Sequence, residues 1–419
     1  MNEGSLSRKS VRICLLTDSF YPVVGGGEGQ ARLMARSLRE RGHEVTVLTQ
    51  HRFASSPRHE VLDGVDVMRV GRPGLKRWGK YLMMPASLFK LLITAGRWDV
   101  VYVAGLRTLG VVGVAAATLT GRRCLLRSAS CAELSGDYIF EHLNTGPSSR
   151  WMKALLRGYL ALRNWVLLKA DGFLAMSSAI EHEYLACDVD PQKIARIPNG
   201  VDLSRFRPLG AAGRKELRQA LELPVEGVLM TYTGKLNRGK GLETLLRSWR
   251  RIAAEREDAH LVLVGSGGGM YLSCEAELRS YVSEHSLEGR VTFTGYQQNV
   301  HEYLQASDIY VMPSESEALS NSLIEGLSCG LPTVASAVGG MLDVVTHERD
   351  GLLVPAGDEE ELAAALRRLM NDGELSARLG AAARERAQAF DVQRITTLYE
   401  QLFASLAAGS GVPCSSSEQ

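Results

Sequence analysis

The sequence predicts an α/β protein made of two domains of the doubly wound kind. Short apolar runs alternate with amphipathic helical patterns along the chain, which is typical of parallel sheets covered by helices. This alternation restarts near the middle of the sequence. With 419 residues, the chain exceeds the size at which one hydrophobic core stops growing. Two similar halves that face each other would form a cleft at the carboxyl ends of their strands.

The first half begins with a strand, a loop and a helix. The helix, expected over 28–41, places Ala31, Met34 and Leu38 at near-helical spacing, and Gly42 is a natural C-cap residue. Helical patterns fill most of the gaps between the later strands. The strands expected in this half cover 11–16, 44–48, 65–70, 100–103, 124–127, 173–175 and 194–197.

The second half repeats the pattern after a turn and an extended link. Pro198-Asn199-Gly200 supplies the turn residues, and Arg207-Pro208 ends the link. The strands expected beyond it cover 228–233, 261–264, 291–293, 309–312, 333–335 and 352–354. The resulting division is a polar tail at 1–10, a domain at 11–200, a domain at 201–390, a terminal helix at 391–407 and a Ser- and Gly-rich, disordered tail at 408–419.

The composition is that of a soluble globular protein. Hydrophobic residues make up 45% and charged residues 23%, and the net charge of +1 gives no reason to expect a nucleic-acid partner. Seven scattered cysteines without a Cys-x-x-Cys pair argue against a disulfide framework or a structural zinc site, and they favour the cytoplasm. The N-terminus lacks the apolar core of a secretory signal, and the apolar stretch 109–119 is too short to cross a bilayer.

Two glutamates eight positions apart, Glu317 and Glu325, follow the strand expected at 309–312. Within one helix this spacing would place them on different faces. It is consistent with Glu317 on the loop after the strand and Glu325 one to two turns into a helix that Ser320 caps. Both carboxylates then border one crevice, and the helix start directs free N–H groups into it, where a phosphate would bind.

Two lysines, Lys235 and Lys240, lie in a glycine-containing loop after the first strand of the second half. Cations in such a loop stabilise the charge that develops on a departing phosphate. Gly234, Gly239 and Lys240 also match the P-loop pattern, but Gly241 replaces the Ser or Thr that would bind magnesium, which disfavours a kinase or ATPase. The remaining alternative is an exposed basic turn.

Two further loops contain glycine runs, 25–27 and 265–269, and both follow a strand. Neither completes G-x-G-x-x-G, because Gln30 and Met270 occupy the sixth positions, so a nicotinamide-dependent dehydrogenase is disfavoured. Asp188-Val189-Asp190 spells a metal-binding Asp-x-Asp, but it precedes Pro191 in a helix-ending loop and is interpreted as a solvated turn. No metal site is expected.

Together these motifs resemble glycosyltransferase family four, the retaining enzymes with the GT-B fold of two facing Rossmann-like domains. The resemblance covers 11–406 and is most specific at 291–355. It implies that Glu317 contacts the donor sugar and that Glu325 binds the nucleotide ribose. It also assigns the diphosphate to the Asn321 and Ser322 backbone amides, to the Gly26 backbone and to the side chains of Lys235 and Lys240. The terminal helix would cross back to the first domain.

The function implied by the resemblance is transfer of a hexose from a nucleotide diphosphate sugar to a hydroxyl of a saccharide or lipid-linked acceptor, as in polysaccharide biosynthesis. Neither a metal nor another cofactor is implied. Three departures from the family pattern are visible: Lys235 replaces an arginine, Ala318-Leu319-Ser320 replaces Gly-Phe-Gly, and Ser128-Ala129-Ser130 replaces a segment with a donor-contacting histidine. A sugar-nucleotide-binding subunit without turnover and a nucleotide-sugar epimerase remain alternatives.

A basic and apolar segment at 72–89 is the candidate for contact with an anionic membrane surface. It begins with Arg72, Lys76, Arg77, Trp78 and Lys80, and bulky apolar residues follow. Such a stretch can rest peripherally on the inner face of a membrane. A loop that leads into an ordinary core helix explains the pattern equally well.

Overall fold

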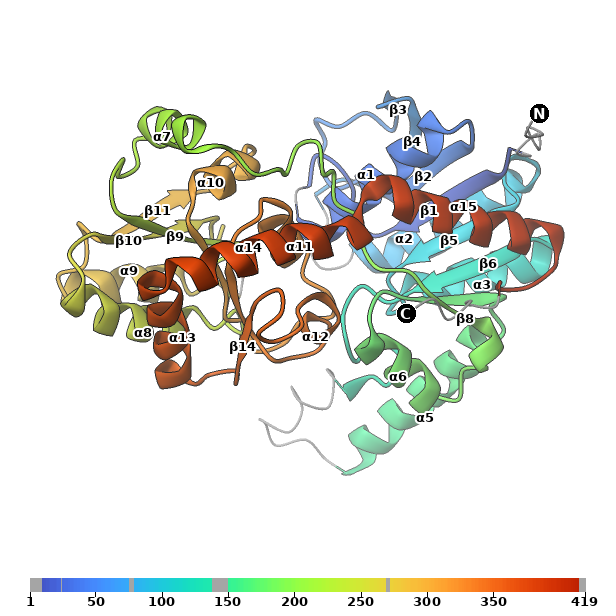
Figure 1. Ribbon diagram of the computed structural model, residues 1–419. Helices are drawn as coiled ribbons and strands as arrows, with labels where there is room; N and C mark the ends of the chain where they lie inside the picture. The colour runs from blue at the N-terminus through green and yellow to red at the C-terminus, as the bar shows by residue number, and fades with distance from the viewer. Residues whose placement is uncertain (1–9, 24, 75–78, 138–149, 269–271, 414–419) are drawn as a thin grey trace, which may run out of the picture. The chain divides into compact units, whose positions relative to one another are not determined.

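The chain divides into two compact units in a computed structural model (Figure 1). The structure describes residues 10–23, 25–74, 79–137, 150–268 and 272–413. Unit 1 contains the chain up to Gly200 together with the segment from Val392, and unit 2 spans Val201–Asp391. The described residues do not include the segment 75–78, with its Lys76, Arg77 and Trp78, or Gly269. They also omit residues 1–9 of the first predicted tail and residues 414–419 of the second.

Unit 1 is built on an eight-stranded sheet. All neighbouring strands are parallel except the first pair, which is antiparallel. In spatial order the strands are β3 (His59–Leu62), β4 (Val65–Val70), β2 (Glu44–Gln50), β1 (Arg12–Thr17), β5 (Val100–Ala104), β6 (Arg123–Arg127), β7 (Gly172–Ala175) and β8 (Ile194–Arg196).

Helices cover both faces of this sheet. On one face, α1 (Gly26–Glu40) packs beside α15 (Val392–Ala408), which Figure 1 shows in red in front of the strands. On the other, α3 (Leu109–Thr120) packs against α2 (Gly79–Ile93) and α5 (Arg150–Leu167), and α6 (Ser178–Ala186) contacts β7 and β8. Short 3-10 turns at Ala95–Arg97 and Pro191–Lys193 precede β5 and β8.

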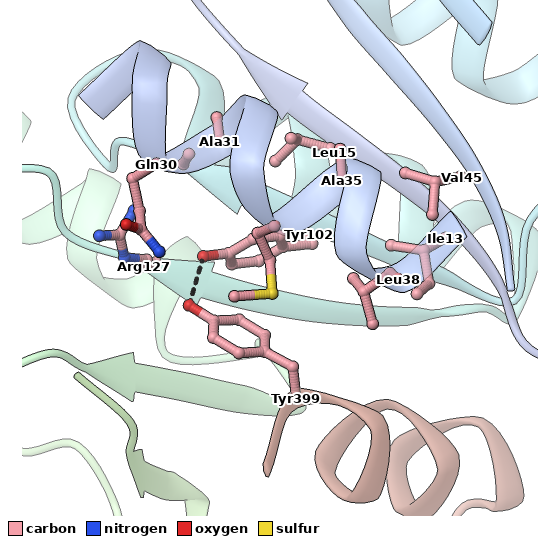
Figure 2. A pocket seen from close by; sticks show the side chains of 12 residues that line it. Ile13, Leu15, Gln30, Ala31, Ala35, Leu38, Val45, Tyr102, Arg127 and Tyr399 are labelled. Carbon is pink, nitrogen blue, oxygen red and sulfur yellow. Dashed lines mark hydrogen bonds between the residues drawn. The ribbon is translucent and has the colours of Figure 1, made fainter. Parts of the chain in front are cut away.

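The C-terminal helix α15 belongs to the hydrophobic core of unit 1. Ile395, Tyr399 and Phe403 are buried in one cluster with α1 and the central strands. The Tyr399 and Tyr102 hydroxyls are 3.2 Å apart beside a cavity of about 20 Å³ (Figure 2). The polar side chain of Arg127 also lines this cavity. The space suits about one water molecule rather than a nucleotide, so it is a packing feature and not the candidate site.

Unit 2 is built on a six-stranded parallel sheet. In spatial order the strands are β11 (Val291–Gly295), β10 (Ala259–Val264), β9 (Val228–Thr233), β12 (Ile309–Met312), β13 (Thr333–Ser336) and β14 (Leu352–Val354). This is the 3-2-1-4-5-6 order of the dinucleotide-binding fold, with its reversal between β9 and β12.

The helices of unit 2 also form two layers (Figure 1). One layer contains α8 (Leu242–Glu255), α9 (Glu275–Glu284) and α13 (Glu359–Asn371). The other contains α7 (Ala211–Ala220), α10 (Val300–Ala306), α11 (Asn321–Ser328) and α14 (Gly373–Ala387), and the short α12 (Met341–Val344) contacts α11. A 3-10 turn at Gln388–Phe390 ends the unit.

The α/β fold class expected from the sequence, two Rossmann-like parallel-sheet units, is confirmed. Every expected strand is present, and its ends are shifted by two residues at most. The helix expected at 28–41 is also confirmed, although it begins at Gly26 and ends at Glu40. The strand β3 was not predicted from the sequence, and its residues His59 to Leu62 alternate between exposed and partly buried positions. An edge strand without a buried face lacks the apolar signal by which strands are predicted.

Candidate active site

Two loops of unit 2 that are far apart in the sequence, those with Lys240 and Glu317, meet where the order of the strands reverses. Lys240 lies on the loop after β9 and Glu317 on the loop after β12, and these strands are neighbours. Lys240 Nζ donates a hydrogen bond to Glu317 Oε1 over 2.6 Å, and the buried Ser314 hydroxyl donates to the same oxygen over 3.0 Å. In open α/β sheets this switch point is the usual ligand site.

Glycines allow the loops around Glu317 to approach closely. Gly241 has φ +65°, and a Cβ added there would lie 1.8 Å from the Pro313 carbonyl oxygen. Gly339 has φ +48°, and its added Cβ would lie 2.1 Å from the Glu317 carbonyl oxygen, which accepts a hydrogen bond from Gly340 N over 3.0 Å. The missing P-loop hydroxyl therefore has a physical reason, because no side chain fits at position 241.

The start of α11 is formed as the sequence predicted. Ser320 is its N-cap, and the Ser320 side chain accepts a hydrogen bond from Leu323 N over 3.3 Å. Asn321 and Ser322 occupy the first turn, so their backbone N–H groups belong to the helix end that attracts anions. Glu317 lies on the preceding loop and Glu325 in the second turn, which confirms the local structure expected for this motif.

The charges of Glu317 and Glu325 both influence one buried side chain, that of Tyr310. The Tyr310 phenol on β12 has its pKa raised by burial and further by the charges of Glu325 and Glu317, while its hydroxyl lies 3.1 Å from Thr233 Oγ1. Both carboxylates are therefore close enough to influence one hydroxyl, although they lie on different local elements. The charges of both glutamates of the motif thus reach the Tyr310 hydroxyl from different local elements.

Glu325 has the most perturbed carboxyl group of this cluster. Desolvation raises the pKa of Glu325 from 4.5 to about 7, and the charge of Arg205 offsets part of that effect. Arg205 is itself held by hydrogen bonds to Gln298 O over 2.9 Å and to His301 Nδ1 over 3.3 Å. Arg205 lies in the extended link expected between the two domains, just before Arg207-Pro208, and no local pattern marks it as a partner of Glu325.

Lys235 lies on the same loop as Lys240 but in a different environment. Its side chain is exposed, and its ammonium makes no ion pair with a residue that the structure describes. A neighbouring glycine loop is fixed by Glu275, the first residue of α9, which accepts a hydrogen bond from Gly267 N over 2.8 Å. That bond is the main reason why the pKa of Glu275 is lowered.

In unit 1 the corresponding loops also follow the strands where the order reverses, β1 and β5. Gly26 is the first residue of α1, after the N-cap residue Gly25. The Glu28 carboxylate accepts a hydrogen bond from the Ser19 hydroxyl, which ties the helix start to the loop after β1. Gly26 therefore lies at a helix N-terminus at the carboxyl edge of its sheet, as the sequence indicated.

The segment that replaces the family's histidine is organised by a glutamate that the sequence analysis missed. Ser128 is buried, and its N–H donates to the Tyr184 hydroxyl over 2.8 Å. The buried Glu133 accepts hydrogen bonds from Leu106 N over 2.9 Å and Ala129 N over 3.2 Å, and it pairs with Arg107 over 3.2 Å. Glu133 thus joins the loops after β5 and β6, and a single acidic residue in a loop gives no sequence signal of such a role.

The metal-binding alternatives find no support in the part of the chain that the structure describes. No group of three or more His, Cys, Asp or Glu side chains there could hold a metal ion. Asp188 and Asp190 are both exposed, and the Asp190 side chain accepts a hydrogen bond from Gln192 N over 2.9 Å, which confirms the solvated turn. The described cysteines form no disulfide. None of the described helices is long and apolar enough to cross a membrane.

The sequence matches two known protein families, one in each unit. Residues 24–205 match the family described as Glycosyltransferase Family 4, and residues 213–386 match Glycosyl transferases group 1. Together the two matches cover most of the chain, and each lies largely in one unit.

Curated relatives include the lipopolysaccharide core biosynthesis glycosyltransferase LpsD of Rhizobium meliloti, 35% identical over 48% of this chain and 55% of that protein. A D-inositol 3-phosphate glycosyltransferase of Saccharomonospora viridis is 32% identical over 55% of this chain and 54% of that protein. The chain thus spans about half the length of these relatives. The corresponding protein of Kineococcus radiotolerans is 27% identical over 90% of this chain and 92% of its own length.

Solved structures share the fold over nearly the full chain. Sucrose-phosphate synthase from Thermosynechococcus elongatus has a TM-score of 0.77 at 25% identity, covering 95% of this chain and 100% of that one. HepE of Anabaena, in complex with UDP and glucose, has a TM-score of 0.75 at 22% identity, covering 94% and 100%. At this identity the likeness to HepE concerns the fold alone.

Proposed function

Because the chain belongs to the family 4 glycosyltransferases of group 1, we propose that it moves a hexose from a nucleotide diphosphate sugar to a hydroxyl of a saccharide or lipid-linked acceptor. The observation that carries this proposal is the pairing of Lys240 with Glu317 at the switch point of unit 2. The N-terminus of α11 begins only a few residues after Glu317. A cation, a helix end and two carboxylates suit a ligand with phosphates and hydroxyl groups.

The proposed reaction proceeds with retention and without a metal. The bond between the anomeric carbon and the phosphate oxygen breaks, and the nucleotide diphosphate leaves with the electron pair. Lys240 and Lys235 stabilise the charge on that leaving group, and the backbone amides of Asn321 and Ser322 receive the diphosphate. The acceptor oxygen attacks from the same face, and its proton passes to the departing phosphate oxygen. The Gly26 backbone is a further proposed contact of the donor phosphate.

The carboxylates of Glu317 and Glu325 bind different parts of the donor. Glu317, fixed by Lys240 and Ser314, accepts hydrogen bonds from hydroxyl groups of the sugar. Glu325 accepts hydrogen bonds from the ribose hydroxyls. In the free protein Lys240 is paired with Glu317, which holds the ammonium group in position. The diphosphate then binds an ammonium group that is already in place and that Glu317 also contacts. Such positioning before binding lowers the cost of reorganisation during reaction.

Relatives indicate which substrates to test first. A structure of the Anabaena protein contains UDP-glucose, so UDP-glucose is the first donor, followed by sugars carried on GDP and ADP. LpsD is named for lipopolysaccharide core biosynthesis, and other relatives are named for D-inositol 3-phosphate. We therefore propose to test a lipid-linked saccharide and D-inositol 3-phosphate as the two acceptor classes.

The deciding experiment compares two lysine variants. Lys240→Ala should lower turnover by about 100-fold or more, because it removes a charge that acts on the developing phosphate, while nucleotide affinity falls less. The control is Lys215→Ala on α7, whose ammonium pairs with the exposed Glu226. Equal turnover of the two variants, with any donor that the wild-type protein uses, would remove the assigned role of Lys240.

A second candidate function is binding of a sugar nucleotide without transfer. The specific observation is that Ser128, at the position of the family's histidine region, is buried and bonded to Tyr184 rather than free to meet a donor. Nucleotide binding without glycoside product or donor hydrolysis, across both acceptor classes, would favour this alternative. Product formation would exclude it.

A further inference from the structure

Three neighbouring helices of unit 1 share an unusual charge pattern. α3 packs against both α2 and α5, so the three form one continuous layer. About one residue in nine of the chain is Asp or Glu, yet these helices contain neither. Their charged residues are all cations: Lys80, Lys90, Arg150, Lys153, Arg157 and Arg163. In contrast, α1 and α15 on the other face carry Glu28, Glu40 and Glu400.

The helix α5 turns large apolar side chains toward solvent. Leu160 and Leu167 are buried on its inner side, where Leu167 lies close to Gly110 of α3. On its outer side five large apolar or aromatic residues, at the spacing of one helical face, are each more than half exposed: Trp151, Leu155, Tyr159, Leu162 and Trp165. The two tryptophans are separated by about 21 Å along the axis at 1.5 Å per residue.

The helix α2 continues this surface. Met83 and Leu91 are fully buried, which accounts for its role as a core helix. Its outer side carries four residues that are about half exposed or more, namely Tyr81, Leu82, Phe89 and Ile93. The segment that is interpreted either as a membrane contact or as a loop leading into a core helix ends at Phe89, within α2. One side of this helix belongs to the core, and the other is an exposed apolar surface.

We propose that the α2, α3 and α5 layer is the surface by which unit 1 binds an anionic lipid membrane. Exposed tryptophan, tyrosine and leucine on a helix with cations and without carboxylates are the features of helices that lie in the membrane interface. Acidic lipid headgroups supply the negative charge that these helices lack. The exposed leucines and Phe89 enter the acyl boundary, while the tryptophans occupy the headgroup level.

A second copy of the chain fits this surface less well. A two-fold contact would bring the same helices of both copies together. Three cationic helices of one copy would then face the same three helices of the other, and none of these helices contains Asp or Glu. The proposal concerns binding alone and does not depend on the proposed transfer reaction, because it is tested without donor or acceptor.

The test uses the full chain and vesicles of phosphatidylcholine with and without phosphatidylglycerol. The wild-type protein should co-sediment with the phosphatidylglycerol vesicles, and added salt should weaken this binding. The double variant Leu155→Glu and Leu162→Glu should bind at least about tenfold more weakly, because each leucine loses favourable apolar transfer. The matched control is Val61→Glu, at an equally exposed position on the edge strand β3, which should bind like the wild type.

Tryptophan emission provides a second measurement. Trp98 and Trp249 are buried, whereas Trp151 and Trp165 are exposed on α5. Binding should shift the emission of the wild-type protein to shorter wavelength, and the double leucine variant should not shift although it retains every tryptophan. Equal vesicle binding of wild type and double variant would overturn the proposal. So would absence of wild-type binding, or a concentration-dependent dimer that the double variant abolishes.

Discussion

Replacement of Glu325 by glutamine should stabilise unit 2 at alkaline pH and weaken nucleotide binding at the same time. Glu325 lies on α11, and desolvation raises the pKa of its carboxyl group from 4.5 to about 7. Glutamine keeps the shape of the side chain and removes its titration. The comparison therefore isolates the free energy of an ionised carboxylate at this position.

The sign and size of the effect follow from proton linkage. The native pKa lies above the unfolded value, so the stabilising contribution of protonated Glu325 is complete below about pH 4.5 and is lost as the pH rises through about 7. One pKa unit corresponds to about 1.4 kcal/mol, so the ionised carboxylate costs at most about 3 kcal/mol. The unfolding free energy of Glu325→Gln, relative to wild type, should increase by up to that amount between pH 4.5 and pH 8.5.

Urea denaturation of both proteins without ligand, at several pH values, measures this difference. Other titrating groups are the same in both proteins and cancel in the comparison. Hydrogen exchange of the α11 amides shows whether the change is local to unit 2. Glu385→Gln, at an exposed position on α14, is the control and should show no such pH dependence. A constant free-energy difference between Glu325→Gln and wild type across the range would refute the reasoning.

The proposed ribose contact of Glu325 is tested by comparing nucleotide binding of the same two proteins. Ribose hydroxyls donate hydrogen bonds to the ionised form, which is about 10% of the free protein at pH 6 and about 90% at pH 8 if the pKa is about 7. The ratio of wild-type to variant affinity for UDP, measured by calorimetry, should therefore rise by roughly tenfold over this range. Titration of the nucleotide phosphate affects both proteins equally, so it cancels in this ratio. A ratio that does not change with pH would contradict the proposed contact of Glu325 with the ribose.

Three other predictions follow from single contacts. Glu317→Gln should release Lys240, so UDP should bind at least as tightly while transfer slows by about tenfold or more; a loss of UDP affinity equal to the loss of turnover would contradict this. Gly241→Ala should destabilise unit 2 by about 2 kcal/mol or more in thermal unfolding, because its Cβ would meet the Pro313 carbonyl oxygen; Gly239→Ala, where φ is also positive but no atom lies within 4 Å, is the control that should cost less. Glu133→Gln should lower unfolding free energy by about 1–3 kcal/mol and reduce kcat with the UDP dissociation constant unchanged, since its bonds to Leu106 N and Ala129 N lie in unit 1; a parallel change in UDP binding would show that its effect is not confined to that unit.

The helix start at Ser320 and the strand before it could be predicted from the sequence because their signals are local. An apolar run, a capping serine and a glycine after the helix act over a few residues, and the structure retains each of them. The same reasoning identified both α/β units and the loop that contains Lys240. The strand β3 could not be predicted, because it is set by pairing with β4 and not by burial.

What the sequence determined by itself is therefore the alternation of strands and helices and the identity of the charged groups at the strand ends. Tertiary structure alone decided which of those groups meet. Lys240 and Glu317 are far apart in the chain and pair only because β9 and β12 are neighbours, and the raised pKa of Glu325 requires the surroundings that remove water from it. The outer side of α5 likewise has the apolar pattern of a core helix, and only packing shows that it remains exposed. Periodicity and spacing act along the chain, whereas pairing, burial and exposure depend on what the fold places opposite each side chain.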